Sequence, residues 1–321
     1  MSRTGVVVMA YGTPRTPADV ETYYTDIRRG RPPSAEQLAD LVRRYDAIGG
    51  ISPLAERTEA QRLALAEALD ERRPDQFTVV LGQKHAAPFI EDAVRDLAGQ
   101  GITRAVGLVL APHYSAASVG QYQARAAATG LEVGVDWAAI DSWHLEPAYL
   151  DFLAASLAQA RTAMPERHQV LFTAHSLPER SLVDDPYPDQ LRQSAQAVAQ
   201  RVGLDPWADW AIAWQSAGRT PEPWRGPDVA EVIRQLARTG RSDGVVVCAQ
   251  GFVSDHLEVL YDLDIEAAGV ARDAGLAFAR TRSLNDDPTV MAALAERVIR
   301  AAEPTGSAAA GALDGLSLIH I

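Results

Sequence analysis

Short apolar runs recur along the chain, and each ends in a polar loop. Four of them begin at Val6, Leu108, Val170 and Val245. Their length and continuous apolar character are typical of strands buried on both faces. Helical patterns lie between and after these runs, at residues 55–72, 89–100, 147–163, 188–201, 228–238 and 288–300. Strands alternating with helices predict parallel sheets with right-handed crossovers.

Two of the apolar runs are near copies of one another. VVVMAYGT and VLFTAHSL both read as strand, alanine, titratable ring and turn, with Tyr11 and His175 at matching places. Both are followed by a helix-start signal. The copies predict an α/β fold of two similar Rossmann-like, doubly wound domains with parallel sheets, facing each other across a cleft. The expected division is an N-terminal domain at 1–143, a C-terminal domain carrying the metal site at 144–287, a final helix packing back on the body at 288–302, and a disordered or artefactual tail at 303–321.

His175 stands where the second copy turns from strand to helix. In open α/β sheets, ligands bind at the carboxyl ends of strands. An imidazole there can take protons near neutral pH or hold a metal. Ser176 and Glu179 have the spacing of a capping box, which predicts a helix that begins at Ser176. A capped turn with an incidental histidine is the alternative.

An acidic stripe follows the run at Val245. With Ser254 or Asp255 as helix cap, Glu258, Asp262 and Glu266 fall at i, i+4 and i+8 on one helix face. A solvated acidic face is the ordinary explanation. The strand end, however, should place Glu258 in the same cleft as His175, where the carboxylates would form a route for a divalent cation or for protons. Carboxylate and imidazole together suit ferrous iron. His256 is expected to turn away from Glu258.

Positive charge gathers between residues 28 and 45. The segment DIRRGRPP holds three arginines, and Arg43, Arg44 and Tyr45 follow. Such a cluster suits a multiply anionic small molecule, although a basic surface loop would look the same.

The formal net charge of −12 argues against nucleic acid as a partner. Cys248 is the only cysteine, so one chain cannot supply four cysteine ligands to a [2Fe–2S] cluster. The first apolar run is too short for a signal peptide and no stretch is long enough to span a membrane, so we expect a cytoplasmic protein without stable membrane insertion.

The sequence strongly resembles the ferrochelatase family. The matching stretches occur in family order over roughly residues 4–300, and they are MAYGTP, YYTDIRRGR, YDAIGGISPL, LGQKHAAPFIEDAV, LAPHYS, AHSLPE, DPYPDQL, WQSAGRTPEPW, GPDV and GFVSDHLEVLYDLDIE. The resemblance implies a porphyrin cleft between the two domains. It also implies that His175 and Glu258 are the catalytic pair and the Fe²⁺ site, with Asp262 and Glu266 continuing an acidic path. By the same resemblance, the residues around the porphyrin and its propionates are Arg28, Arg44, Tyr45, Ser52 and Tyr122.

The resemblance is closest to the coproporphyrin III type of monoderm (Gram-positive) bacteria. Tyr11 matches the residue that can ligate iron in the product of that type, and the segment after it is polar and arginine-bearing. We therefore expect Fe²⁺ insertion into coproporphyrin III for haem biosynthesis, with Fe²⁺ as substrate and no redox cofactor. A monomer with a transient hand-off to a downstream haem-synthesis enzyme is expected. The alternatives are a protoporphyrin IX ferrochelatase, a cobalt chelatase for a related tetrapyrrole, and a non-catalytic haem-binding protein.

Overall fold

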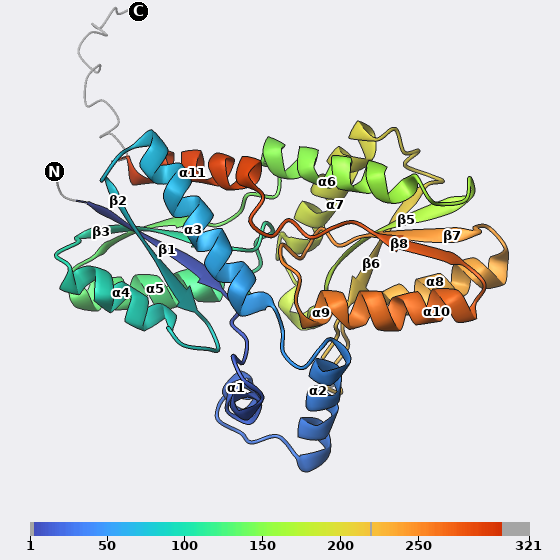
Figure 1. The fold of residues 1–321 in the computed structure, drawn as a ribbon, viewed down its shortest axis with the longest axis horizontal. Coiled ribbons are helices and arrows are strands. Elements are labelled where there is room, and N and C mark those ends of the chain that lie inside the picture. Colours follow the sequence, from blue (N-terminus) through green and yellow to red (C-terminus); the bar gives the residue numbers. More distant parts are fainter. Residues whose placement is uncertain (1–2, 219, 304–321) are drawn as a thin grey trace, which may run out of the picture.

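Two four-stranded parallel sheets form the body of the protein (Figure 1). The computed structural model describes residues 3–218 and 220–303. The first sheet has the order β2-β1-β3-β4, from β1 (Thr4–Ala10), β2 (Phe77–Gln83), β3 (Arg104–Val109) and β4 (Asp136–Ile140). The second has the order β6-β5-β7-β8, from β5 (His168–His175), β6 (Trp210–Gln215), β7 (Gly244–Cys248) and β8 (Ala277–Arg280). The two sheets therefore repeat one topology, which confirms the predicted fold class.

Helices flank both sheets. Their bounds are α1 (Val20–Ile27), α2 (Ala35–Ala47), α3 (Leu54–Arg72), α4 (Ile90–Gly99), α5 (Val119–Val133), α6 (Pro147–Arg161), α7 (Tyr187–Arg201), α8 (Val229–Thr239), α9 (Leu257–Leu260), α10 (Ala268–Asp273) and α11 (Pro288–Ala302). The six predicted helices are confirmed, with their ends shifted by up to two residues. Helix α5 has no counterpart among them. Its Gly120 and Gly130 weaken helix propensity, yet a Cβ at Gly130 would lie 2.7 Å from the Val135 carbonyl oxygen, so close packing requires the glycine.

One hydrophobic cluster joins the two halves. It includes Val6 and Leu108 from the first sheet and Phe172 from the second, all fully buried. Helix α11 packs against α3, β3, β4 and α6. The boundary at 143/144 stays a prediction, and the expected tail lies outside the described residues except for Glu303.

The helix predicted to begin at Ser176 does not form, and this prediction is wrong. Only a short 3₁₀ turn, Glu179–Ser181, follows, and α7 begins at Tyr187. The Ser176 hydroxyl is buried and donates to the Arg225 carbonyl at 2.7 Å instead of capping a helix. The chain after it runs beside residues 223–225, where the Arg225 N–H donates to the Leu177 carbonyl. A distant backbone partner thus displaces the local cap.

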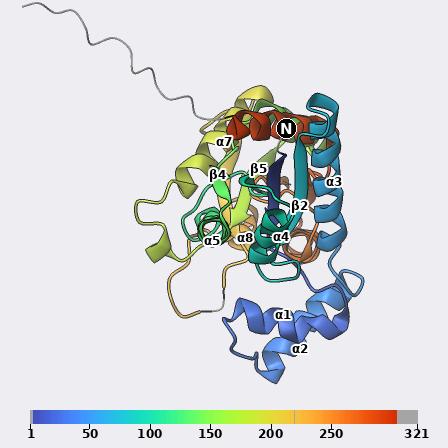
Figure 2. The same ribbon diagram turned by 90° about the vertical axis from the view of Figure 1, so that its left-hand side faces the viewer.

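Helices α1 and α2 project from the end of the molecule opposite α11, which both views show (Figures 1 and 2). The helix-start signal predicted after Tyr11 is the segment Thr16–Asp19, where the Thr16 N–H donates to Asp19 at 2.9 Å in a capping box before α1. Within the described ranges, no helix has both the length and the apolar character that a membrane crossing requires.

Candidate active site

His175 and Glu258 meet at the carboxyl ends of β5 and β7. His175 is the last residue of β5, and Glu258 lies in the first turn of α9, after the loop that follows β7. The Nε2 atom of His175 lies 3.5 Å from a carboxylate oxygen of Glu258. The expectation that the two side chains lie close together is confirmed. The other ring nitrogen, Nδ1, donates to the Ser176 carbonyl, which leaves Nε2 directed at the carboxylate.

Each member of this pair stabilises the charge of the other. Burial alone would lower the pKa of His175, but the Glu258 carboxylate outweighs burial and raises it. Burial alone would raise the pKa of Glu258, but the charge and hydrogen bond of His175 outweigh it and hold that pKa well below its usual range. At neutral pH the pair is therefore an imidazolium and a carboxylate.

His256 faces Glu258, so the expectation that it turns away is wrong. Its Nε2 atom lies 3.6 Å from the second carboxylate oxygen of Glu258. The expectation assumed that both residues belong to one helix. His256 is instead the extended residue before α9, with φ −159° and ψ −178°, and its Nδ1 donates to the Ser254 carbonyl at 2.8 Å. The predicted cap at Ser254 or Asp255 is wrong for the same reason.

Asp262 and Glu266 of the acidic stripe lie on a π-helix, whereas Glu258 lies on α9, so the predicted single helix that carries all three does not form. The π-helix spans Asp262–Ala267, between α9 and α10, and the Glu266 N–H reaches the Tyr261 carbonyl at 2.9 Å. π-helices often occur at functional sites. Asp262 is buried, and burial together with the Glu258 charge raises its pKa to about 6. Glu266 is exposed. The carboxylates thus pass from solvent at Glu266 to the pair at Glu258.

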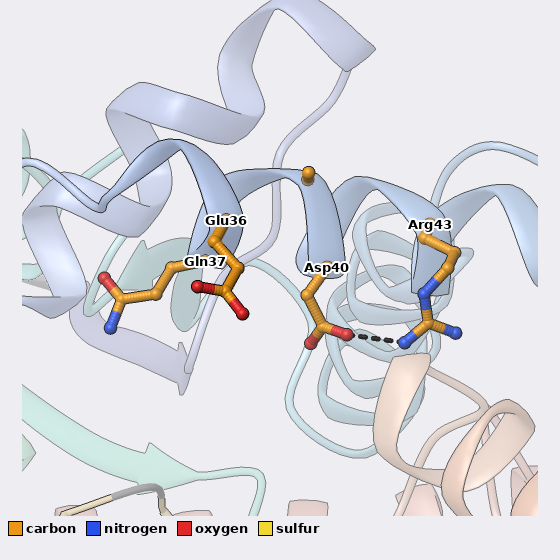
Figure 3. A pocket seen from close by; sticks show the side chains of 5 residues that line it. Glu36, Gln37, Asp40 and Arg43 are labelled. Carbon is orange, nitrogen blue, oxygen red and sulfur yellow. Dashed lines mark hydrogen bonds and ion pairs between the residues drawn. The ribbon is translucent and has the colours of Figure 1, made fainter.

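Two arginines of α2 reach this π-helix. Arg44 lies 3.6 Å from Asp262, and its guanidinium stands over the Tyr261 ring at 5.0 Å. Arg43 donates to the Tyr261 hydroxyl at 2.9 Å. Asp40 binds both arginines, and Figure 3 shows its ion pair with Arg43 on one side of α2. The like charges of the stripe are therefore relieved by a basic side chain from another part of the chain.

Three tyrosines of the N-terminal half feel the charge of Glu258. Burial raises the pKa of Tyr11, Tyr45 and Tyr122, and the Glu258 charge raises each of them further, which places all three within its electrostatic reach. Tyr11 keeps 42% of its surface exposed, whereas Tyr45 and Tyr122 are buried. The site is thus open at Tyr11. Its ring contacts the His85 ring in a tilted arrangement, with 4.6 Å between ring centres and 58° between ring planes.

Two predicted substrate-binding residues make local hydrogen bonds. Arg28 ends α1, where its Nε donates to the Arg31 carbonyl at 3.2 Å. Ser52 is buried and accepts a hydrogen bond from the Leu54 N–H. Neither of these contacts reaches the pair.

Sequence reasoning missed the residues that hold the pair in place. Gln215, at the end of β6, accepts from the Ser176 N–H through its carbonyl and donates to the Glu258 carbonyl at 2.7 Å through its side chain. The Tyr187 hydroxyl donates to the His175 carbonyl at 3.2 Å. The position of Gln215 at the end of a strand could have marked it as a site residue. Nothing in the sequence around Tyr187 marks it, because its partner His175 lies on another element. Across the described ranges, no three His, Cys, Asp or Glu side chains are grouped so as to hold a metal ion.

Known proteins match this chain over nearly its whole length. The family profile described as Ferrochelatase matches residues 3–302. The chain is 46% identical over 303 residues to the coproporphyrin III ferrochelatase of Geobacillus kaustophilus (strain HTA426), covering 92% of this chain and 95% of that protein. It is 43% identical over 305 residues to the coproporphyrin III ferrochelatase of Bacillus subtilis (strain 168), covering 93% and 97%.

Solved structures share the fold at low sequence identity. SirB from Bacillus subtilis with Fe³⁺ has a TM-score of 0.54 at 11% identity, covering 94% of this chain and 96% of that one. CbiX, the terminal enzyme for biosynthesis of siroheme in denitrifying bacteria, has a TM-score of 0.51 at 14% identity, covering 94% and 100%. These likenesses concern the fold alone, and the profile and the curated relatives carry the assignment. The chain belongs to the ferrochelatase family.

Proposed function

We propose that this protein, a porphyrin metal chelatase of the lyase class, inserts Fe²⁺ into coproporphyrin III to give Fe-coproporphyrin in haem biosynthesis. The observation that carries the proposal is the His175–Glu258 pair, set at strand ends, with Tyr11 within the electrostatic reach of Glu258. The curated relatives at 43–46% identity support the choice of porphyrin.

The chemistry needs a proton acceptor beside a metal-binding carboxylate. Free porphyrin carries two N–H protons where the metal must go, and these must leave as Fe²⁺ enters. Glu258 would attract the cation. A dication at this carboxylate would lower the pKa of the neighbouring imidazole, so His175 would release its Nε2 proton to solvent water. The freed Nε2 lone pair would then accept the two pyrrole N–H protons in turn and pass each to water, so that two protons leave as Fe²⁺ enters. Because Nδ1 is held by the Ser176 carbonyl, Nε2 is the atom that acts.

The remaining residues would bind the two substrates. Asp262 and Glu266 would guide Fe²⁺ from solvent to the pair. Tyr11 would stand on the opposite side of the ring and ligate the iron of the product. Propionate contacts would come from Arg28, Arg44, Tyr45, Ser52 and Tyr122. Binding energy from these contacts would offset the strain of a bent porphyrin, whose nitrogen lone pairs tilt toward the metal.

We also propose that the protein acts as a cytoplasmic monomer with two domains, 1–143 and 144–287. It would use no redox cofactor, since the iron enters and remains as Fe²⁺. The single cysteine, Cys248, is buried and supports the proposal that no [2Fe–2S] cluster is bound. The product would pass transiently to a downstream haem-synthesis enzyme, with no nucleic acid or membrane partner.

Anaerobic Fe²⁺ insertion, followed by Soret absorbance, tests the proposal. Coproporphyrin III and protoporphyrin IX are compared in parallel, and a higher kcat/KM for coproporphyrin III is expected. A preference for protoporphyrin IX would keep the chelatase but refute the substrate. Turnover of cobalt with a related tetrapyrrole in preference to either, or tight haem binding without turnover, would overturn the proposal.

A further inference from the structure

The segment that follows β8 is hydrogen-bonded to the loop that leads to His256 and Glu258. This segment, 281–287, runs from the second sheet to α11, as Figure 1 shows. It is far from the loop in sequence. Among the described residues, its central contact is Asn285, which touches the loop through both backbone and side chain.

Asn285 makes four hydrogen bonds around this loop. Its N–H donates to the Val253 carbonyl at 2.7 Å, and its carbonyl accepts from Gln61 at 2.9 Å. Its side-chain oxygen accepts from the Asp255 N–H, and its amide nitrogen donates to the Asp255 carboxylate, both at 3.0 Å. The side chain thus grips Asp255 at two points. Asp255 immediately precedes His256 and stands three residues before Glu258. Both of these side chains therefore follow a residue that Asn285 holds in place.

Asp255 extends the clamp to the π-helix. Its carboxylate accepts from the Ser283 hydroxyl at 2.8 Å and from Arg280 at 3.3 Å. Arg280 also binds Asp264 of the π-helix at 2.8 Å. The Gln61 side chain, from α3 of the N-terminal half, accepts from the Ser254 hydroxyl at 3.0 Å. One polar cluster therefore fixes the Glu258 loop, the π-helix and the opposite half of the molecule together.

The backbone of Asn285 supports a positioning role. Its φ is +47°, in the left-handed region that glycine adopts freely and other residues adopt at a cost. A glycine would satisfy this backbone without strain. The asparagine supplies the two side-chain hydrogen bonds to Asp255, which glycine cannot make.

We propose that Asn285 is a positioning residue for metal binding, acting through Asp255 on the placement of Glu258. The inference rests on the proposed function, and it assigns Asn285 no contact with metal or porphyrin. Residues that orient metal ligands typically affect metal affinity or activity by about 10- to 100-fold. A loosened loop should therefore impair iron use while leaving the porphyrin contacts of the other half intact.

The test begins with Asn285→Gly, which removes the clamp and keeps the backbone conformation. We expect kcat/KM for Fe²⁺ to fall by about tenfold or more, with KM for coproporphyrin III changed by less than about twofold. Asp75→Gly is the matched control, because Asp75 also has a positive φ (60°) and pairs with Arg3 away from the site. It should behave as wild type.

Asn285→Asp adds a reciprocal test. It sets two carboxylates against each other, so it should impair iron use at least as strongly as the glycine variant. The double variant Asp255→Asn/Asn285→Asp exchanges the two side chains and restores a donor and an acceptor at the clamp. It should recover part of the lost kcat/KM for Fe²⁺. Ser283→Ala, which removes one hydrogen bond to Asp255, should give a smaller loss and serves if the other variants fold poorly.

Co²⁺ binding, read from its visible absorption, separates this inference from the proposed function. If the wild type binds Co²⁺ but inserts no iron, the proposed function is refuted. The role of Asn285 can still be tested in that case, because it predicts weaker Co²⁺ binding in Asn285→Gly than in the wild type. If wild type is active and folded Asn285→Gly matches it for both Fe²⁺ and Co²⁺, the inference is overturned. Equal losses for iron and porphyrin would also overturn it, because they would indicate a general structural role.

Discussion

Replacing Glu258 with glutamine should lower the pKa of His175. Two influences oppose each other at this histidine in the wild type, with burial lowering its pKa and the Glu258 carboxylate raising it. Glutamine has nearly the same size as glutamate but no charge. The substitution therefore leaves burial in place and removes the influence that outweighs it.

The geometry bounds the size of the change. Opposite unit charges about 4 Å apart attract by about 1 kcal/mol in a water-like medium and by about 4 kcal/mol near a protein surface. The two side chains are 3.5 Å apart and 35% and 36% exposed, so solvent screens them and the lower part of this range applies. An attraction of about 1.4 kcal/mol corresponds to about one pKa unit. We expect the pKa of His175, which is about 9 in the wild type, to fall by at least that amount.

Imidazole nitrogen chemical shifts, followed by NMR across a pH series, measure this pKa directly. Glu91→Gln is the control, because it removes a carboxylate that lies 2.7 Å from Arg125 and is not among the charges acting on His175. The control should leave His175 unchanged. An unchanged pKa in Glu258→Gln, or a higher one, would refute the conclusion that the pair is ionised.

The same pair sets the sign of a pH effect on stability. Since the folded-state pKa of His175 is raised, the folded protein holds this proton more tightly than the unfolded chain. The contribution is complete below the ordinary histidine pKa and is lost as pH rises through the raised value. Denaturant unfolding should show a smaller alkaline loss of stability in Glu258→Gln than in wild type, and an equal loss would contradict the assignment.

Three further substitutions test other parts of the description. His175→Ala should abolish iron insertion while porphyrin binding, measured by fluorescence quenching, stays within about threefold of wild type; substantial turnover would exclude the assigned role. Asp262→Asn should reduce kcat/KM for Fe²⁺ less than Glu258→Gln does, because it lies farther along the acidic path, and a larger effect would reverse that order. Phe172→Ala should lower the free energy of unfolding by about 3–5 kcal/mol in urea titration, since the ring is fully buried in the hydrophobic cluster that includes residues of both halves, and a loss below about 1 kcal/mol would contradict that packing.

The strands and their repeat could be predicted because their signals are local. A buried parallel strand must be apolar over its whole length, and Val6–Ala10 and Val170–Phe172 show this without reference to their partners. The place of His175 at a strand end follows from the same pattern. Its nearness to Glu258 could be expected as well, since the carboxyl ends of neighbouring parallel strands meet at one edge.

Local signals failed where a distant partner competes for the same atoms. Ser176 and Glu179 have the spacing of a capping box, yet the Ser176 hydroxyl binds the Arg225 carbonyl and no helix begins there. His256 looked like a helical residue turned from Glu258. It is extended, and the residue before it is hydrogen-bonded to Asn285, a contact of which the sequence near His256 contains no sign.

The sequence by itself determined the two-fold α/β repeat, the family and the residue types at the strand ends, because hydrophobic period and motif order are properties of neighbouring residues. Only the tertiary structure decided which polar atoms meet. The pairing of Arg44 with Asp262, of Gln215 with Glu258 and of Asn285 with Asp255 joins segments that are remote along the chain. Buried polar groups must find partners, and packing selects those partners only once the two halves have come together.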